Sequence, residues 1–86
     1  MYLTQHLTSN YYWLCSKVFA SNSSKKSIEA CFNTLRRTNT YKNNFYIKNN
    51  LLISKKTNEP IDKIICEFPD NWTYNDFKEN YPELLI

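Results

Sequence analysis

Hydrophobic and polar residues alternate along this chain with periods that predict helices first and a small sheet afterwards. Over residues 11–20, most large apolar side chains fall on one arc of about 160° when successive positions are turned by 100°, and Trp13 lies off this arc: on it are Tyr11, Tyr12, Leu14, Cys15, Val18 and Phe19. The residue types of this segment (Tyr, Trp, Val and Phe) favour a strand instead, so composition and period disagree. The angular pattern predicts a first helix, with Ser9 or Asn10 as its N-cap.

A second helix is predicted between Ser24, as N-cap, and the pair Arg36 and Arg37. Its apolar residues follow the i, i+3, i+4, i+7 spacing of a helix with one buried face: Ile28, Cys31, Phe32 and Leu35. The two arginines fall in the last turn, where cations interact favourably with the negative end of the helix dipole. This segment has the clearest helical pattern in the chain.

The middle of the chain predicts a β-hairpin. Two apolar-rich runs, residues 45–48 and 51–54, flank the dipeptide Asn49-Asn50. Asn tolerates left-handed backbone better than any residue except Gly, so this dipeptide is suited to a two-residue turn. The expected cross-strand pairs are Ile47 with Leu52 and Tyr46 with Ile53.

A third strand and a short helix complete the predicted elements. Residues 63–68 alternate between apolar and polar positions, which is typical of a strand with one buried face. Thr73 and Asp76 have the spacing of a capping box, and Pro82 is expected to end the helix that follows. The sequence therefore predicts one small α+β domain, residues 1–86. It has two N-terminal helices, a three-stranded antiparallel sheet (the hairpin plus a third strand) and a short C-terminal helix, in the order α-α-β-β-β-α.

Composition excludes several classes of function. None of the 86 residues is Gly, whereas phosphate-binding loops, dinucleotide fingerprints and EF-hand turns all need a residue without a Cβ. His6 is the only histidine, and no His or Cys spacing is typical of a metal site. We therefore expect no catalytic residue, no metal and no cofactor, and the protein is not expected to be an enzyme.

Three cysteines, Cys15, Cys31 and Cys66, form an odd set without paired spacing. This pattern predicts free thiols in a reducing, cytoplasmic environment. The longest apolar run, residues 11–15, is too short to span a membrane, and we expect neither a signal peptide nor a membrane partner. The excess of Asn, Lys, Tyr and Ile is typical of mobile genetic elements or viruses.

Charge is distributed unevenly along the chain. Residues 1–58 contain nine Lys or Arg and one Glu, a charge of +8, whereas residues 59–86 contain two Lys and seven acids, a charge of −5. Together they give the net charge of +3. The basic part is typical of a surface that contacts nucleic acid, but the two parts can also neutralise each other across the folded surface.

Six basic residues of the predicted second helix and hairpin are the candidate nucleic-acid contacts: Lys25, Lys26, Arg36, Arg37, Lys48 and Lys55. The run from Ser24 to Ile28, with Phe32 and Leu35, resembles the recognition helix of a helix-turn-helix protein, and a hairpin after it resembles the wing of a winged-helix protein. The resemblance implies contact with DNA. Residues 18–23 lack the small residue and Gly of the usual turn, and an amphipathic core helix with a solvated basic face explains the same pattern.

Two functions remain open from the sequence. The first is a small non-enzymatic module that binds DNA or RNA through its basic helix and hairpin. The second is an inhibitor or immunity-type protein of a mobile element that occludes a larger protein target. Trp13 and Trp72 are the candidate contacts of this alternative, because exposed aromatic side chains often anchor protein interfaces. The sequence leaves the oligomeric state open.

Overall fold

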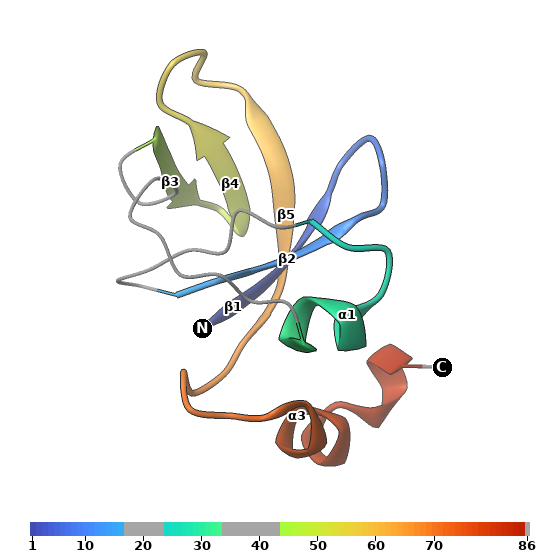
Figure 1. Cartoon of the computed structure of the whole chain (residues 1–86). Helices are drawn as coiled ribbons and strands as arrows, with labels where there is room; N and C mark the ends of the chain where they lie inside the picture. Colours follow the sequence, from blue (N-terminus) through green and yellow to red (C-terminus); the bar gives the residue numbers. More distant parts are fainter. Residues whose placement is uncertain (17–23, 34–43, 86) are drawn as a thin grey trace.

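An antiparallel sheet forms the centre of the fold, and two helices lie against one of its faces (Figure 1). The structure is a computed structural model that describes residues 1–16, 24–33 and 44–85. Within these residues there are five strands, β1 (Tyr2–His6), β2 (Tyr12–Cys15), β3 (Phe45–Lys48), β4 (Leu51–Ser54) and β5 (Pro60–Glu67). The helical elements are α1 (Ile28–Asn33), α3 (Tyr74–Asn80) and the 3₁₀ helix η1 (Pro82–Leu85). Along the sheet the strands follow the order β2-β1-β5-β4-β3, and all neighbours are antiparallel.

The predicted pair of N-terminal helices is wrong, because the first two elements are strands and the first helix begins only at Ile28. β2 pairs with β1 along its whole length. Its residues, Tyr-Trp-Leu-Cys, suit a pleated surface, and the pairing provides partners for backbone groups that would otherwise bond within a helix. The described residues therefore form a sheet of five strands, not the predicted three. Residues 17–20 of the predicted helix lie outside the described residues.

The predicted hairpin is confirmed, and its register is the predicted one. Ile47 lies opposite Leu52, and Tyr46 lies opposite Ile53. Asn49 and Asn50 have φ angles of 54° and 61°, which is the left-handed backbone that a type I′ turn requires at both central positions. The local sequence was sufficient here because the turn alone determines how the two strands align.

The third predicted strand and the C-terminal helix are also present. β5 begins at Pro60, three residues before the predicted start, and ends at Glu67. The capping box is confirmed: Thr73 Oγ1 accepts a hydrogen bond from the Asp76 backbone N–H at 3.3 Å, and the Asp76 carboxylate accepts one from the Thr73 N–H at 2.9 Å. α3 ends two residues before Pro82, as the proline predicts.

Helix α1 begins later than predicted, because Ser27 rather than Ser24 caps it. The Ser27 Oγ accepts a hydrogen bond from the backbone N–H three residues further on, at 3.2 Å. Lys25 instead forms a short bridge with Tyr12 of β2, with backbone hydrogen bonds of 2.7 Å and 3.0 Å in the two directions. Residues 34–37 of the predicted helix lie outside the described residues.

The first of two cores lies between the sheet and the helices. Its buried members are Met1, Leu3, Leu14, Ile28, Cys31, Phe68 and Phe77. Of the six residues that the helix and strand periodicities predict to share one core, Cys31, Phe32, Cys66 and Phe68 belong to it. Leu35 lies outside the described residues, and Ile64 is not a member. An irregularity in the β1–β5 register between Leu3 and Thr4 places Cys66 opposite Leu3 but Ile64 opposite Thr4, so Ile64 and Cys66 project to opposite faces of the sheet.

A second, smaller core covers the other face. Cys15 of β2 and Leu52 of β4 are buried in one cluster, although β1 and β5 lie between their strands in the sheet. Half-buried Tyr2, Trp13, Phe45 and Ile61 pack around them. The sheet must therefore coil strongly, so that its two edges approach each other over this face, as twisted sheets with bulges do.

Candidate nucleic-acid interface

The strand register places one residue of each strand on a single row across the sheet. Directly paired residues in antiparallel strands project to the same face. The pairing runs from Lys48 through Leu51, Lys63, Gln5 and Tyr12 to the bridging residue Lys25. We call these six residues the lysine row. It lies on the face that carries the first core, since Leu3 is two residues before Gln5 and projects to the same side.

The helices cover only part of this face. Leu3 and Leu14 beneath them are completely buried, whereas Lys48 and Lys63 are exposed and Lys25 is half-buried. In Figure 1 the β3–β4 hairpin and the first half of β5 project beyond the helices. The lysine row therefore crosses the part of this face that the described helices leave uncovered, beside helix α1. We call this face, which carries the first core, the outer face of the sheet, and the face that carries the second core the inner face.

The lysine row combines positive charge with polar and aromatic side chains. Adjacent strands are about 4.8 Å apart, so Lys48 and Lys63 are separated by about 10 Å, and Tyr12 lies about 10 Å beyond Lys63. None of its three lysines forms an ion pair with another described residue. The nearest carboxylate in sequence, Asp62, is completely buried and projects to the opposite face. The arrangement can therefore present unpaired ammonium groups to an extended anion.

The structure places two of the six predicted contacts, Lys48 and Lys25, at the two ends of the lysine row. Lys26 is exposed beside Lys25, at the edge of a cavity next to Tyr12. Lys55 is exposed as well, but it lies at the opposite end of the β3–β4 hairpin from Lys48. Arg36 and Arg37 lie outside the described residues.

Sequence reasoning missed Lys63, which lies at the centre of the lysine row. It belongs to the acidic third of the chain, so the charge profile assigned it to the wrong surface. The only signal was its outward position in the predicted third strand. One of its two neighbours in the row, Gln5, comes from β1, a strand far away in sequence, and the other, Leu51, begins the preceding strand β4.

Acidic residues collect at the other end of the molecule. After Asp62, the described chain contains five more acids, on the end of β5, the following turn, α3 and η1: Glu67, Asp70, Asp76, Glu79 and Glu83. Only Lys63 and Lys78 are basic in this part. Figure 1 shows α3 and η1 on the far side of α1 from the hairpin. The charge asymmetry of the sequence is thus also a spatial asymmetry.

A buried polar cluster connects β1 to β5 on the inner face. Asp62 and Thr4 are both completely buried, and the Thr4 hydroxyl donates a hydrogen bond of 3.0 Å to Asp62 Oδ2. The other carboxylate oxygen accepts a hydrogen bond from Nδ1 of His6. The His6 ring meets the Trp13 ring edge-on, with centroids 4.8 Å apart. His6 is thus part of an ordered interior cluster, not of a mobile terminus.

Both tryptophans of the protein-binding alternative are half-buried. Trp13 lies in the second core beside His6. Trp72 stacks on Phe68, with centroids 5.4 Å apart and an angle of 20° between the rings. Neither side chain is among the exposed large hydrophobic residues of the described chain, which are Leu7 and Ile47.

Burial favours the protonated thiol at two of the three cysteines, Cys31 and Cys66. Burial raises the pKa of the Cys31 thiol to about 11, and it likewise raises the pKa of Cys66 to about 11, with a smaller effect from Glu83. The Cys31 Sγ donates a hydrogen bond to the Tyr12 carbonyl oxygen at 3.1 Å, which also requires the protonated form. Within the described residues, no group of three His, Cys, Asp or Glu side chains is placed to bind a metal ion.

The chain matches no protein-family model, and no curated protein and no solved structure is significantly similar to it. In the described part of the chain, no helix has the length and hydrophobicity needed to cross a membrane.

Proposed function

We propose that this protein binds the phosphate backbone of a nucleic acid through the lysine row. The observation that supports the proposal is the register: it aligns Lys48, Lys63 and Lys25 across the outer surface, although they are distant in sequence. Lysines that neutralise phosphates displace condensed counterions, which is the main source of sequence-independent affinity for nucleic acid. Gln5 and Tyr12, which lie between the lysines, add hydrogen-bonding groups for phosphate or sugar.

The expected binding is of the non-specific class. Lysine contacts to phosphate determine position along the backbone but do not read the base sequence. Non-specific binding of nucleic acid typically has dissociation constants of about 10⁻⁴ to 10⁻⁶ M near physiological salt, and we expect a row of three lysines to lie at the weak end of this range. Single strands and duplexes present the same phosphate groups. Comparing the affinity of the protein for the two shows which of them it prefers.

The proposal is tested by fluorescence anisotropy at low salt, with a labelled duplex and one of its strands as probes. The variant Lys48→Ala/Lys63→Ala removes two charges from the lysine row. The control variant Lys55→Ala/Lys56→Ala removes two charges from exposed positions at the other end of the hairpin. We expect the first variant to bind about tenfold more weakly and the control to change by less than about twofold. Equal losses in both variants, or no binding by the parent protein, would contradict the proposal.

A further inference from the structure

A cavity of about 310 Å³ lies at the acidic end, between the end of α1 and the turn that precedes α3. Its most buried lining residues are Met1 and Leu14, which form an apolar floor. Its walls are the half-buried aromatic side chains Phe32, Trp72 and Tyr74. The volume is at the lower limit of known ligand pockets, which suits a single side chain better than a large ligand.

The aromatic walls are fixed by further ring contacts in the first core. Trp72 stacks on Phe68 on one side. Phe32 is 5.7 Å from Phe68 and 5.8 Å from Tyr74, measured between ring centroids. The rings therefore keep their positions without a ligand, which lowers the entropic cost of binding.

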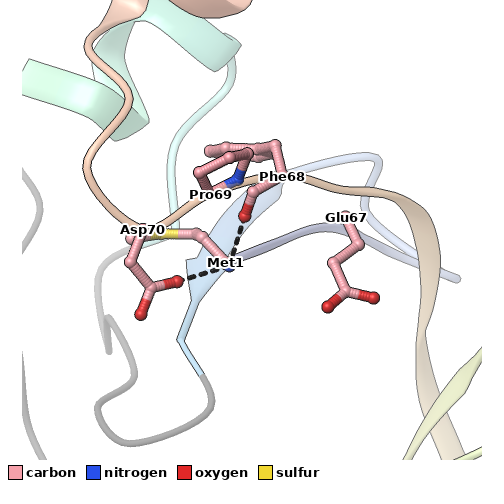
Figure 2. Close-up of a pocket in the computed structure, with 5 residues that line it drawn as sticks. All are labelled: Met1, Glu67, Phe68, Pro69 and Asp70. Carbon is pink, nitrogen blue, oxygen red and sulfur yellow. Dashed lines mark hydrogen bonds and ion pairs between the residues drawn. The ribbon is translucent and has the colours of Figure 1, made fainter.

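Asp70 provides a carboxylate at the edge of this cavity. One of its oxygens pairs with the Met1 amino group, which also donates a hydrogen bond of 2.6 Å to the Phe68 carbonyl oxygen (Figure 2). The other oxygen accepts no hydrogen bond from the described residues, and the side chain is 46% exposed. Figure 2 shows the carboxylates of Asp70 and Glu67 on either side of Met1, and both residues line a second open cavity of about 460 Å³.

The chemistry of this pocket selects for a cation with an apolar stem. Aromatic faces attract cations through their quadrupole. A guanidinium group stacks on aromatic rings and also donates hydrogen bonds to a carboxylate in its plane. The surrounding surface is acidic, with five carboxylates and a single lysine between residues 67 and 85. Lys78 already lies over the Tyr74 ring, 5.8 Å from its centroid, although it does not line the cavity.

We infer that this pocket binds an arginine side chain from a basic segment of a partner protein. The arginine stem covers the apolar floor, and the guanidinium lies against the aromatic walls and bonds to the exposed oxygen of Asp70. The pocket shares no residue with the lysine row, although Tyr12 of the row and Tyr74 of the pocket wall line a neighbouring cavity beside α1. The protein would thus contact an anion at one end and a basic protein segment at the other.

The direct test is an NMR titration with acetyl-Gly-Arg-Gly-amide, against the neutral isostere acetyl-Gly-citrulline-Gly-amide. The two indole N–H signals are the readout, because Trp72 lines the pocket whereas Trp13 lies in the second core. We expect the arginine peptide to shift the Trp72 signal saturably at millimolar concentration, to leave Trp13 unchanged and to bind at least about fivefold more tightly than citrulline. Equal shifts by both peptides, or no saturable shift of Trp72, would overturn the inference.

Matched variants localise the binding. Asp70→Asn is expected to weaken the arginine peptide at least about threefold, whereas Glu79→Gln, the same charge change on α3 outside the pocket, leaves it unchanged. Tyr74→Leu keeps the Asp70 carboxylate and removes one aromatic wall, so it provides a second test if Asp70→Asn loosens the Met1 contact. The row variant Lys48→Ala/Lys63→Ala should bind the peptide like the parent protein. Equal losses in Asp70→Asn and Glu79→Gln would show that only general charge attracts the peptide.

Discussion

The carboxylate of Asp62 lies in the interior of the coiled sheet without any exposed surface, and it accepts hydrogen bonds from two residues of β1. A buried carboxylate is tolerated only when its charge is compensated and its lone pairs are bonded. Thr4 and His6 supply these bonds, and they do so across 58 and 56 positions of sequence. Thr4 is thus buried because it bonds to Asp62, an acid far away in sequence. The local sequence around Thr4 does not indicate this burial.

Removing His6 should therefore be costly. The variant His6→Ala leaves the Asp62 carboxylate with fewer bonds and opens space beside Trp13, so we expect the free energy of unfolding to fall by about 3 kcal/mol. Chemical denaturation monitored by tryptophan fluorescence measures this change. Gln5→Ala, a half-buried neighbour with one hydrogen bond of 3.3 Å, is the control and should cost less than about 1 kcal/mol. A loss below 1 kcal/mol in His6→Ala would show that the cluster is not a stabilising contact.

The raised pKa values of Cys31 and Cys66 predict a loss of stability in alkali. The ordinary pKa of a cysteine thiol is 9.0, and in the folded chain the pKa of both thiols is about 11. Between these two pH values the unfolded chain therefore loses thiol protons that the folded chain retains. The free energy of unfolding should therefore be unaffected by these groups below pH 9 and should fall as the pH rises from 9 to 11. The variant Cys31→Ala/Cys66→Ala serves as the reference, and its stability should fall less over the same interval. Parallel curves for the two proteins would refute this assignment.

At the scale of the elements, local chemistry predicted the parts that depend on neighbouring residues. The Asn49-Asn50 turn and the capping box of Thr73 and Asp76 are both present, because each is decided within a few residues. The sequence predicted a helix where strand β2 lies. Four residues are too few to distinguish the period of a strand from that of a helix. Its partner β1 was not recognised as a strand either, because its buried position at Thr4 is polar. In the proposed lysine row, Lys25 and Lys48 follow from local charge, whereas Lys63 joins them only through the pairing of the strands, which the charge profile does not contain.

The capping box makes a prediction at this scale. In Thr73→Ala, the backbone N–H of Asp76 loses its acceptor, and the Asp76 carboxylate loses the hydrogen bond of the Thr73 hydroxyl, whereas the backbone N–H of residue 73 still faces that carboxylate. We expect a decrease of about 1 kcal/mol in the free energy of unfolding, measured by urea denaturation. Thr8→Ala, an exposed threonine in the turn between β1 and β2, is the matched control and should change stability by less than about 0.5 kcal/mol. Similar effects at the two positions would mean that the cap does not stabilise α3.

At the scale of the whole molecule, residues of opposite charge gather at different ends of the helix-covered face of the sheet. The lysine row crosses the outer face beside the hairpin, and the acids follow β5 into α3 and η1 (Figure 1). A net charge of +3 conceals this separation. The other explanation of the sequence pattern is that the basic residues of positions 1–58 neutralise the acidic residues of positions 59–86. This would require basic and acidic side chains to lie side by side on the folded surface. In the described residues the three lysines of the row form no ion pair with an acid.

The salt dependence of nucleic-acid binding tests the central claim most directly. For a duplex, the logarithm of the binding constant falls by about 0.9 per logarithmic unit of salt for each phosphate that is neutralised. Replacing Lys48 and Lys63 by Ala should therefore flatten the measured slope by about 1.8 relative to the parent protein, if each lysine contacts one phosphate. The variant Lys55→Ala/Lys56→Ala should leave the slope close to that of the parent. Equal slopes in the parent and the Lys48→Ala/Lys63→Ala variant would contradict the claim that the lysine row contacts the backbone.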